Sequence, residues 1–398
     1  MPGLLLALAV TLASSFEGGN IRDVERLGPA HFRISIPGES DQDGRNRQAN
    51  WYYFRLDHVK GKSLTLELTN LAGEYNYRPN EGAVTADTPP YFSNDNISWQ
   101  PVTDFTYDSA TPKLVLRLTP VQDRICIAHI PPYTNAHLEL LLREIGRHPA
   151  FRETIIGKTP GGRPLRQWTI TDPAPPDSPR KVIWLMARQH SWEASTSWVA
   201  EGAVRFLLSN EPAAAEIRRT TVFHVLPMCD PDGVARGGVR FNAQGFDVNR
   251  NWDTFNARQN PEITALHGAI AAWVSAGNRI DLFLAMHNTE TAEYLEGPPA
   301  AGDSAFTALG ERFFQLLNTQ TSFGPTRPLS WAEPTTTPGK PGRMTVVQGL
   351  YRDFRLPAFL SDQRISFQPK LNRRPTTEDR LHFGAELAQA MRRAVAGL

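Results

Sequence analysis

The sequence predicts an α/β fold that is preceded by an all-β sandwich. The first half of the chain repeats apolar residues with period two between turn-rich stretches, which is typical of antiparallel strands. From about residue 151 onward, apolar strand patterns alternate with amphipathic helix patterns, which predicts an α/β sheet covered on both faces. The length of 398 residues suits two domains.

Four segments of the first half show the strand pattern most clearly. They are residues 51–56, 63–70, 113–118 and 124–130. A long helix pattern is first seen in "NAHLELLLREIG", close to the end of this half. We therefore predict a β-sandwich domain over residues 16–148 and an α/β domain over residues 149–398.

The second half alternates predicted strands and helices. Strand patterns cover residues 163–172, 181–187, 220–230 and 279–287, and helix patterns cover 193–209, 260–277, 304–320 and 377–397. In the second of these helices, Asn260 is suited to the N-cap and Pro261 to the first helical position.

Composition excludes some functions. The formal net charge of +1 and the lack of a basic stripe argue against nucleic-acid binding. The two cysteines, Cys126 and Cys229, lie in apolar contexts and are predicted to be buried free thiols.

The N-terminus begins with a short apolar run at residues 4–13, followed by small residues. We predict a signal peptide over residues 1–15 and hence export to the periplasm or the extracellular space. No Lys or Arg precedes the run, so a misassigned start or a plain apolar N-terminus remains the alternative, and the protein would then be cytoplasmic. No segment is expected to span a membrane after signal removal.

Polar residues follow three predicted strands, where the loops of an α/β sheet converge. His190 and Glu193 follow the first strand at a spacing of three, and His287 follows another. Two imidazoles and one carboxylate form the ligand set of a catalytic zinc site. The alternative is a surface histidine beside a glutamate at a helix entry.

The segment "GFDVNRNWD" concentrates acids, amides and an arginine around one tryptophan. Asn249 and Arg250 are suited to a planar carboxylate, which a guanidinium binds with two hydrogen bonds. Asp247 is suited to holding a ligand imidazole from behind.

Together the motifs "HSWE", "DPDG", "GFDVNRNWD" and "MH" resemble the zinc metallocarboxypeptidases of the carboxypeptidase A type. "WYYFRL", "IPPYTNAHLELL" and "IIGKTPGGRPLRQWTITD" resemble, in that order, the cytosolic-carboxypeptidase-like branch, which carries a β-sandwich ahead of the catalytic domain. The resemblance covers nearly all of the chain after residue 20. It implies a mixed sheet with helices on both faces.

The resemblance also implies an activity, which is removal of the C-terminal residue from peptides or proteins with one zinc ion (Zn2+). His190, Glu193 and His287 match the zinc ligands. Asn249 and Arg250 match the pair that binds the terminal carboxylate of the substrate, and Arg240 matches the arginine that stabilises the oxyanion.

The chain departs from the family pattern in three places. Asp362 stands where the family has a glutamate as general base, so the chain is either an enzyme with a shorter base or a weak or inactive homologue that recognises peptide C-termini. Arg343 in "GKPGR" matches an arginine thought to favour acidic C-terminal residues, but a proline replaces the threonine of that element. Tyr294 and Tyr351 are candidates, by residue type only, for the tyrosine that the carboxypeptidase A type places over the substrate.

Overall fold

The computed structural model describes residues 8–75, 77–176, 178–300, 303–333 and 341–397. The chain divides into two compact units. The first contains Met1–Pro132 together with Arg236–Val239, and the second contains Tyr133–Ala235 together with Arg240–Leu398. The predicted boundary at residue 148 therefore lies inside the second unit, because helix α1 (Asn135–Ile145) belongs to it.

The first unit is a β-sandwich, as predicted. Its two five-stranded sheets have the strand orders β1-β6-β14-β10-β11 and β12-β13-β7-β3-β2, and a small sheet has the order β4-β5-β8-β9. Inward-facing apolar residues of both large sheets form one core, for example Phe54 in β6 and Leu66 in β7. The strands are β1 (Thr11–Ala13), β2 (Arg22–Gly28), β3 (His31–Ser35), β4 (Glu39–Ser40), β5 (Arg47–Gln48), β6 (Tyr53–Asp57), β7 (Leu64–Thr69), β8 (Gly73–Tyr75), β9 (Arg78–Asn80), β10 (Tyr91–Ser93), β11 (Gln100–Pro101), β12 (Phe105–Asp108), β13 (Lys113–Leu118) and β14 (Arg124–Ala128).

The end of the predicted signal peptide takes part in this sandwich. Residues 1–7 lie outside the described residues, but β1 pairs antiparallel with β6 and the side chain of Val10 is fully buried. Removal of residues 1–15 would therefore take away one edge strand of the sheet.

The second unit is built around a mixed sheet. Among the described residues its strand order is β15-β16-β18-β17-β19-β22-β20-β21. The four central strands β18, β17, β19 and β22 are parallel to one another. The strands on either side of them run antiparallel, since β16 pairs antiparallel with β18 and β20 pairs antiparallel with β22. The strands are β15 (Phe151–Lys158), β16 (Pro164–Ile170), β17 (Lys181–Met186), β18 (Thr221–Leu226), β19 (Leu282–Thr289), β20 (Tyr294–Gly297), β21 (Ser330–Trp331) and β22 (Ala358–Arg364).

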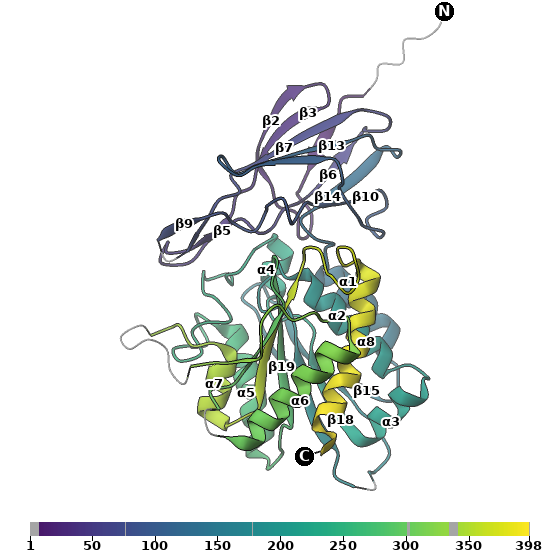
Figure 1. The fold of residues 1–398 in the computed structure, drawn as a ribbon, viewed down its shortest axis with the longest axis vertical. Helices are drawn as coiled ribbons and strands as arrows, with labels where there is room; N and C mark the ends of the chain where they lie inside the picture. The colour runs from purple at the N-terminus through teal and green to yellow at the C-terminus, as the bar shows by residue number, and fades with distance from the viewer. Residues whose placement is uncertain (1–7, 76, 177, 301–302, 334–340, 398) are drawn as a thin grey trace, which may run out of the picture. The chain divides into compact units, whose positions relative to one another are not determined.

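Helices cover both faces of this sheet (Figure 1). On one face, apolar residues of α5 and α7 share a core with Trp184 of β17, Ala285 of β19 and Leu360 of β22. On the other face, Phe313 of α6 contacts Phe359 of β22 with ring centroids 6.1 Å apart. Besides α1, the helices are α2 (Ala194–Leu207), α3 (Pro212–Thr220), α4 (Pro231–Arg236), α5 (Pro261–Ser275), α6 (Ser304–Gln320), α7 (Val346–Phe354) and α8 (Thr377–Ala394).

Helices α2 and α8 cross at unusually short distance because each has a glycine at the crossing. A Cβ on Gly202 would lie 2.0 Å from the carbonyl oxygen of Leu381, and a Cβ on Gly384 would lie 2.1 Å from that of Val199. This close crossing packs the middle of α2, the helix that follows the predicted metal-binding turn, against α8.

Two of the sequence motifs are joined by one aspartate. Asp232 of "DPDG" accepts hydrogen bonds from the Thr159 hydroxyl (2.8 Å), the Gly161 amide (2.8 Å) and Arg163 Nη1 (2.7 Å) of "GKTPGGRP". Burial alone would raise the pKa of Asp232, but these three donors lower it overall. The segment that leads into the second unit is thereby tied to α4.

The predicted helices at 193–209, 260–277, 304–320 and 377–397 are confirmed with small shifts of their ends. Helices α3 and α7 were not predicted, because α7 is only nine residues long and α3 begins directly after a short loop. Both cysteines are buried and free, as expected. None of the helices in the described part of the chain is long and apolar enough to cross a bilayer.

Candidate metal centre

The turn after β17 carries the first two predicted metal ligands. Arg188 adopts a positive φ of 63°, which bends the chain sharply as it leaves the strand. Its buried guanidinium donates to the carbonyl oxygens of Ser191 (2.8 Å) and Tyr133 (3.0 Å) and so holds the turn. The Glu193 amide donates to the His190 carbonyl at 3.2 Å, and α2 begins at the next residue, so both side chains point back over the sheet edge.

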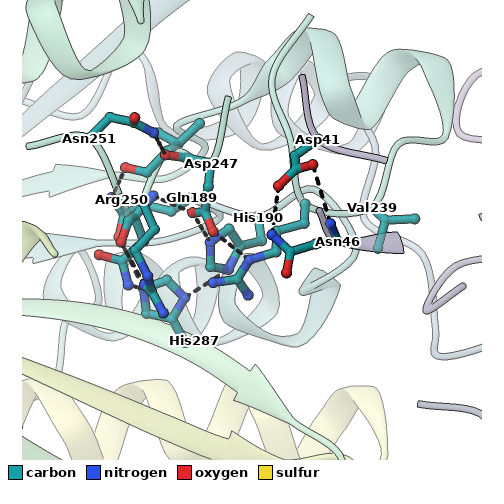
Figure 2. A network of polar contacts seen from close by, with 12 residues as sticks. Asp41, Asn46, Gln189, His190, Val239, Asp247, Arg250, Asn251 and His287 are labelled. Atoms are coloured by element: carbon teal, nitrogen blue, oxygen red, sulfur yellow. Dashed lines mark hydrogen bonds and ion pairs between the residues drawn. The ribbon is translucent and has the colours of Figure 1, made fainter. Parts of the chain in front are cut away.

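The third predicted ligand, His287, lies within β19, the parallel neighbour of β17. Its Nδ1 atom is 2.9 Å from Glu193 Oε2 and 3.2 Å from His190 Nδ1, and His190 Nδ1 is 2.7 Å from Glu193 Oε1. All three side chains are buried, with at most 3 % of any residue exposed. The structure therefore brings together the three residues that the sequence singled out, and Figure 2 shows the imidazoles of His190 and His287 next to each other.

The opposite ring nitrogens are held by acceptors. His190 Nε2 lies 3.1 Å from Asp247 Oδ1, and His287 Nε2 lies 3.0 Å from Gln189 Oε1. A carboxylate can only accept, so Asp247 requires a proton on His190 Nε2. The Nδ1 atoms of His190 and His287 face the Glu193 carboxylate and would be the ligand atoms. The side-chain amide nitrogen of Asn249 is also near His287 Nε2, at 3.3 Å.

This donor set fits zinc. Two nitrogens bound to one tetrahedral zinc ion at about 2.0–2.1 Å are about 3.3 Å apart, and the two Nδ1 atoms are 3.2 Å apart. The three ligand atoms lie within 4.8 Å of one another. The acceptors behind both imidazoles are the arrangement that metal-binding histidines usually have.

The charges around the centre keep its carboxylates ionised. Burial raises the pKa of Glu193, but attraction to His190 and His287 lowers it to about 2. Burial also raises the pKa of Asp247, but Arg240 and His190 hold it well below its usual range. Burial and Arg240 lower the pKa of His190, whereas Glu193 and Asp247 raise it above its ordinary value overall.

The "DVNRN" loop places the predicted carboxylate-binding pair beside the metal ligands. The backbone amide of Asn249 donates to Asp247 Oδ1 (2.9 Å). The side-chain oxygen Oδ1 of Asn249 accepts from the backbone amide of Val346 (3.0 Å) at the start of α7. Arg250 is half-buried and its Nη1 donates to the carbonyl of Asn249 at 2.7 Å (Figure 2). The positive φ of Asn251 (62°) turns the chain directly after this pair.

Arg240 lies against the same carboxylate that holds His190. Its Nε donates to Asp247 Oδ2 at 2.6 Å, and 19 % of its side chain is exposed. The arginine is therefore at the edge of the centre, and the Asp247 carboxylate lies between it and the imidazole of His190.

Asp362 lies in β22 directly opposite His287 in β19. On its other side it lies opposite Tyr294 in β20, whose hydroxyl hydrogen-bonds to it. Burial raises the pKa of Asp362, Glu193 raises it further, and His287 and Tyr294 offset only part of this effect. The predicted base is therefore adjacent to the metal ligands and has an elevated pKa.

Tyr294 rather than Tyr351 is the tyrosine next to the candidate base. The Tyr351 ring on α7 contacts Phe306 and the guanidinium of Arg355 instead, with centroid distances of 6.2 and 4.7 Å.

The backbone around Arg343 is attached to the carboxylate-binding loop. The amides of Gly342 and Met344 donate to the two carboxylate oxygens of Asp253, at 3.0 and 3.3 Å, and the Asn251 amide donates to the Gly342 carbonyl. The structure thus places Arg343, a half-buried residue, between two anchored neighbours.

Three residues of the centre were not predicted. Gln189 lies within hydrogen-bonding distance of His287. The only sequence feature that could have indicated this role is its position directly before His190. Burial raises the pKa of Glu290, and repulsion from Asp362 and Glu193 raises it further, so this glutamate lies near both. Glu296 in β20 has a pKa raised by burial and by Asp362, and the nearby cations Arg327 and Arg250 offset this only in part.

Comparison with known proteins identifies both units. The description "zinc carboxypeptidase" belongs to the family that matches residues 138–295, and "cytosolic carboxypeptidase N-terminal domain" to the family that matches residues 12–130. An uncharacterised protein of Zymomonas mobilis is 31% identical over 261 residues, which are 64% of this chain and 63% of that protein. Mouse cytosolic carboxypeptidase 4 is 29% identical over 318 residues, which are 69% of this chain but only 27% of that protein.

Solved structures share the fold. A metallo-carboxypeptidase from Burkholderia cenocepacia has a TM-score of 0.83 at 22% identity, covering 98% of this chain and 100% of that chain. A metallo-carboxypeptidase from Pseudomonas aeruginosa has a TM-score of 0.78 at 19% identity, covering 96% and 98%. The chain therefore carries a zinc carboxypeptidase domain and, ahead of it, the N-terminal domain of the cytosolic carboxypeptidases.

Proposed function

We propose that the protein is a zinc-dependent metallocarboxypeptidase that removes the C-terminal residue of peptides. The observation that carries this proposal is the convergence of the Nδ1 atoms of His190 and His287 with the Glu193 carboxylate, next to the Asn249–Arg250 loop. The similarity to mouse cytosolic carboxypeptidase 4 supports the proposal. The chain spans less than two thirds of the length of both curated relatives named above.

His190, Glu193 and His287 would hold one zinc ion. Zinc, when bound, supplies a Lewis acid that makes a water molecule more acidic and polarises a carbonyl. The buried position of the three ligands excludes bulk water from their side of the site, which strengthens each electrostatic interaction there.

Arg250 and Asn249 would bind the free carboxylate of the substrate. Nη1 of Arg250 donates to the Asn249 carbonyl. A guanidinium has five N–H donors, so several donors remain for a substrate carboxylate. Recognition of the free carboxylate restricts cleavage to the last peptide bond. Arg240 would donate to the developing oxyanion from the edge of the centre.

Asp362 would accept the proton of the attacking water and pass it to the leaving amine. Its raised pKa suits this exchange, because a general base works best with a pKa near the operating pH. The shorter side chain, by about 1.5 Å relative to glutamate, is the feature that separates this chain from the family pattern.

The resemblance also suggested acidic C-terminal residues as substrates, through Arg343. What supports this suggestion is the attachment of the Arg343 segment to the Asn251–Asp253 turn. The acidic preference stays a prediction, and the negative charge of Glu296 on the neighbouring sheet face favours a different side chain.

The second candidate function is that of a zinc-binding homologue that recognises peptide C-termini without cutting them. The observation that favours it is the aspartate at position 362. In that case the chain would bind zinc and peptides tightly but show no turnover on any peptide.

Export remains a proposal that rests on residues 1–15 alone. N-terminal sequencing of the protein purified from its native host would test it. A mature chain that starts after residue 15 would support export, and a chain that starts at Met1 would contradict it.

A substrate assay tests the main proposal. The zinc-loaded chain should release only the last residue of N-acylated dipeptides and longer peptides, and it should leave the same peptides uncut when their C-terminus is an amide. Arg250→Ala should raise KM for the free acids, whereas Glu378→Gln, which removes an exposed carboxylate of α8, should change nothing. Zinc binding without release of any amino acid would establish the binder instead.

A further inference from the structure

A half-buried carboxylate lies on the same sheet face as the candidate centre. Glu296 is two residues from Tyr294 in β20, so both side chains point to one face of the sheet. Tyr294 is opposite Asp362, and Asp362 is beside His287 on that face, so Glu296 shares the face with the candidate base and a metal ligand. Its direct cross-strand neighbour is Leu360, which is apolar.

Two arginines approach this carboxylate without pairing with it. Arg327 and Arg250 are the cations that act most strongly on Glu296. The guanidinium of Arg327 instead lies over the Tyr294 ring, 3.6 Å from its centroid. Arg250 donates to its neighbouring carbonyl. Within the described part of the chain, no hydrogen bond or ion pair engages the Glu296 carboxylate.

A carboxylate in such a place is costly unless a cation reaches it. Arg250 is the residue that would bind the terminal carboxylate of the substrate, and Glu296 is among its electrostatic neighbours. Because the terminal carboxylate and the side chain of the last residue are bonded to the same Cα, a carboxylate held by Arg250 would bring that side chain close to Arg250 as well. Once the substrate carboxylate neutralises Arg250, Glu296 loses one of the two cations that act on it, and exposed Arg327, which lies over the Tyr294 ring, is the other.

We propose that Glu296 determines specificity by binding a cationic side chain, Lys or Arg, of the C-terminal residue. This inference rests on the proposed carboxypeptidase activity and adds the substrate class to it. It opposes the acidic preference suggested by Arg343, and one substrate panel separates the two. A long side chain is needed because Glu296 projects from β20, two residues along the strand from the position opposite Asp362.

The test compares the zinc-loaded full chain with Glu296→Gln on N-acylated dipeptides that end in Lys, Arg, Gln, Phe or Glu. Glutamine keeps the size of the side chain and removes its charge. We expect Glu296→Gln to lower kcat/KM for Lys and Arg substrates on the order of 30-fold or more, because one partner of a desolvated charge pair is lost. Rates on Gln and Phe substrates should stay unchanged, and the rate on Glu substrates should rise. Glu311→Gln, which removes an exposed carboxylate of α6, is the matched control.

The outcomes distinguish the two levels of the proposal. Wild-type preference for Lys and Arg, lost in Glu296→Gln and retained in Glu311→Gln, supports the assignment. Wild-type preference for Glu or Phe, or an equal effect of Glu296→Gln on all substrates, overturns it while leaving the carboxypeptidase activity in place. No turnover of any substrate by the wild-type protein overturns the activity and the inference together.

Discussion

Replacement of Asp247 by asparagine should weaken zinc binding while the chain stays folded. The carboxylate of Asp247 accepts hydrogen bonds from His190 Nε2 (3.1 Å), from Arg240 Nε (2.6 Å) and from the backbone amide of Asn249 (2.9 Å). Because its pKa lies well below the usual range, the carboxylate is fully charged at neutral pH. Asparagine keeps the shape of the side chain, so the substitution removes the charge and leaves the packing unchanged.

The size of the expected loss in zinc affinity follows from the contacts of Asp247 with His190 and Arg240. A hydrogen bond to a charged group contributes about 1.5–3 kcal/mol. Loss of the partner behind a ligand imidazole typically lowers metal affinity about 10–100-fold, or about 1.4–2.8 kcal/mol. The two figures agree, so we expect the zinc dissociation constant of Asp247→Asn to rise about 10–100-fold.

Competition with a chromophoric zinc chelator measures this constant without any assay of activity. Asp253→Asn is the matched control, since Asp253 lies in the same loop but accepts its hydrogen bonds from the backbone of Gly342 and Met344. Circular dichroism of each variant checks that it is folded. A zinc affinity of Asp247→Asn equal to that of Asp253→Asn would refute the role assigned to Asp247.

Three further predictions concern catalysis, stability and pH. Asp362→Asn should lower kcat on the order of 10²–10⁴-fold, as expected for loss of a general base, while zinc affinity is retained; unchanged kcat in steady-state assays would remove Asp362 from the mechanism. Asp232→Asn should lower the free energy of unfolding by about 1–3 kcal/mol in denaturant titrations. Because the folded pKa of Asp232 is lowered, its stabilisation is present above the unfolded pKa of about 3.9 and is lost as pH falls below it, so the variant should differ less from wild type in acid. Zinc affinity, measured between about pH 8 and pH 6, should fall with pH because protons compete for His190, whose pKa is raised in the absence of the ion; a constant affinity over this range would argue against an imidazole ligand.

The metal ligands could be predicted because they lie where the chain leaves buried strands. An apolar run that ends before "RQHSWE" fixes both the strand and the position of His190 and Glu193 at the sheet edge. His287 needed one more assumption, that its strand is the neighbour of β17, and the parallel pairing of β17 with β19 confirms it.

The residues behind the ligands could not be predicted in the same way. Gln189 contacts His287, which is 98 positions away in the sequence, and the sequence around a single glutamine does not indicate such a contact. Glu296 sits in a four-residue strand whose pattern is too short to reveal which face is buried. Which ring nitrogen faces the centre depends on Asp247 and Gln189 and is a property of the folded site alone.

The composition of the N-terminal segment is compatible both with a signal peptide and with a strand of the sandwich. A run of leucines, alanines and valines suits both the apolar part of a signal peptide and a buried edge strand. In the structure, residues 11–13 form β1 and Val10 enters the sandwich core. Sequence alone does not separate these readings, because both require only a short apolar segment.

Anomalous diffraction at the zinc edge, from crystals of the zinc-loaded chain, tests the central claim most directly. We predict one strong peak per chain, about 2.0–2.2 Å from Nδ1 of His190, Nδ1 of His287 and a carboxylate oxygen of Glu193. A peak elsewhere in the chain, or no peak at this site in crystals that contain stoichiometric zinc, would contradict the account.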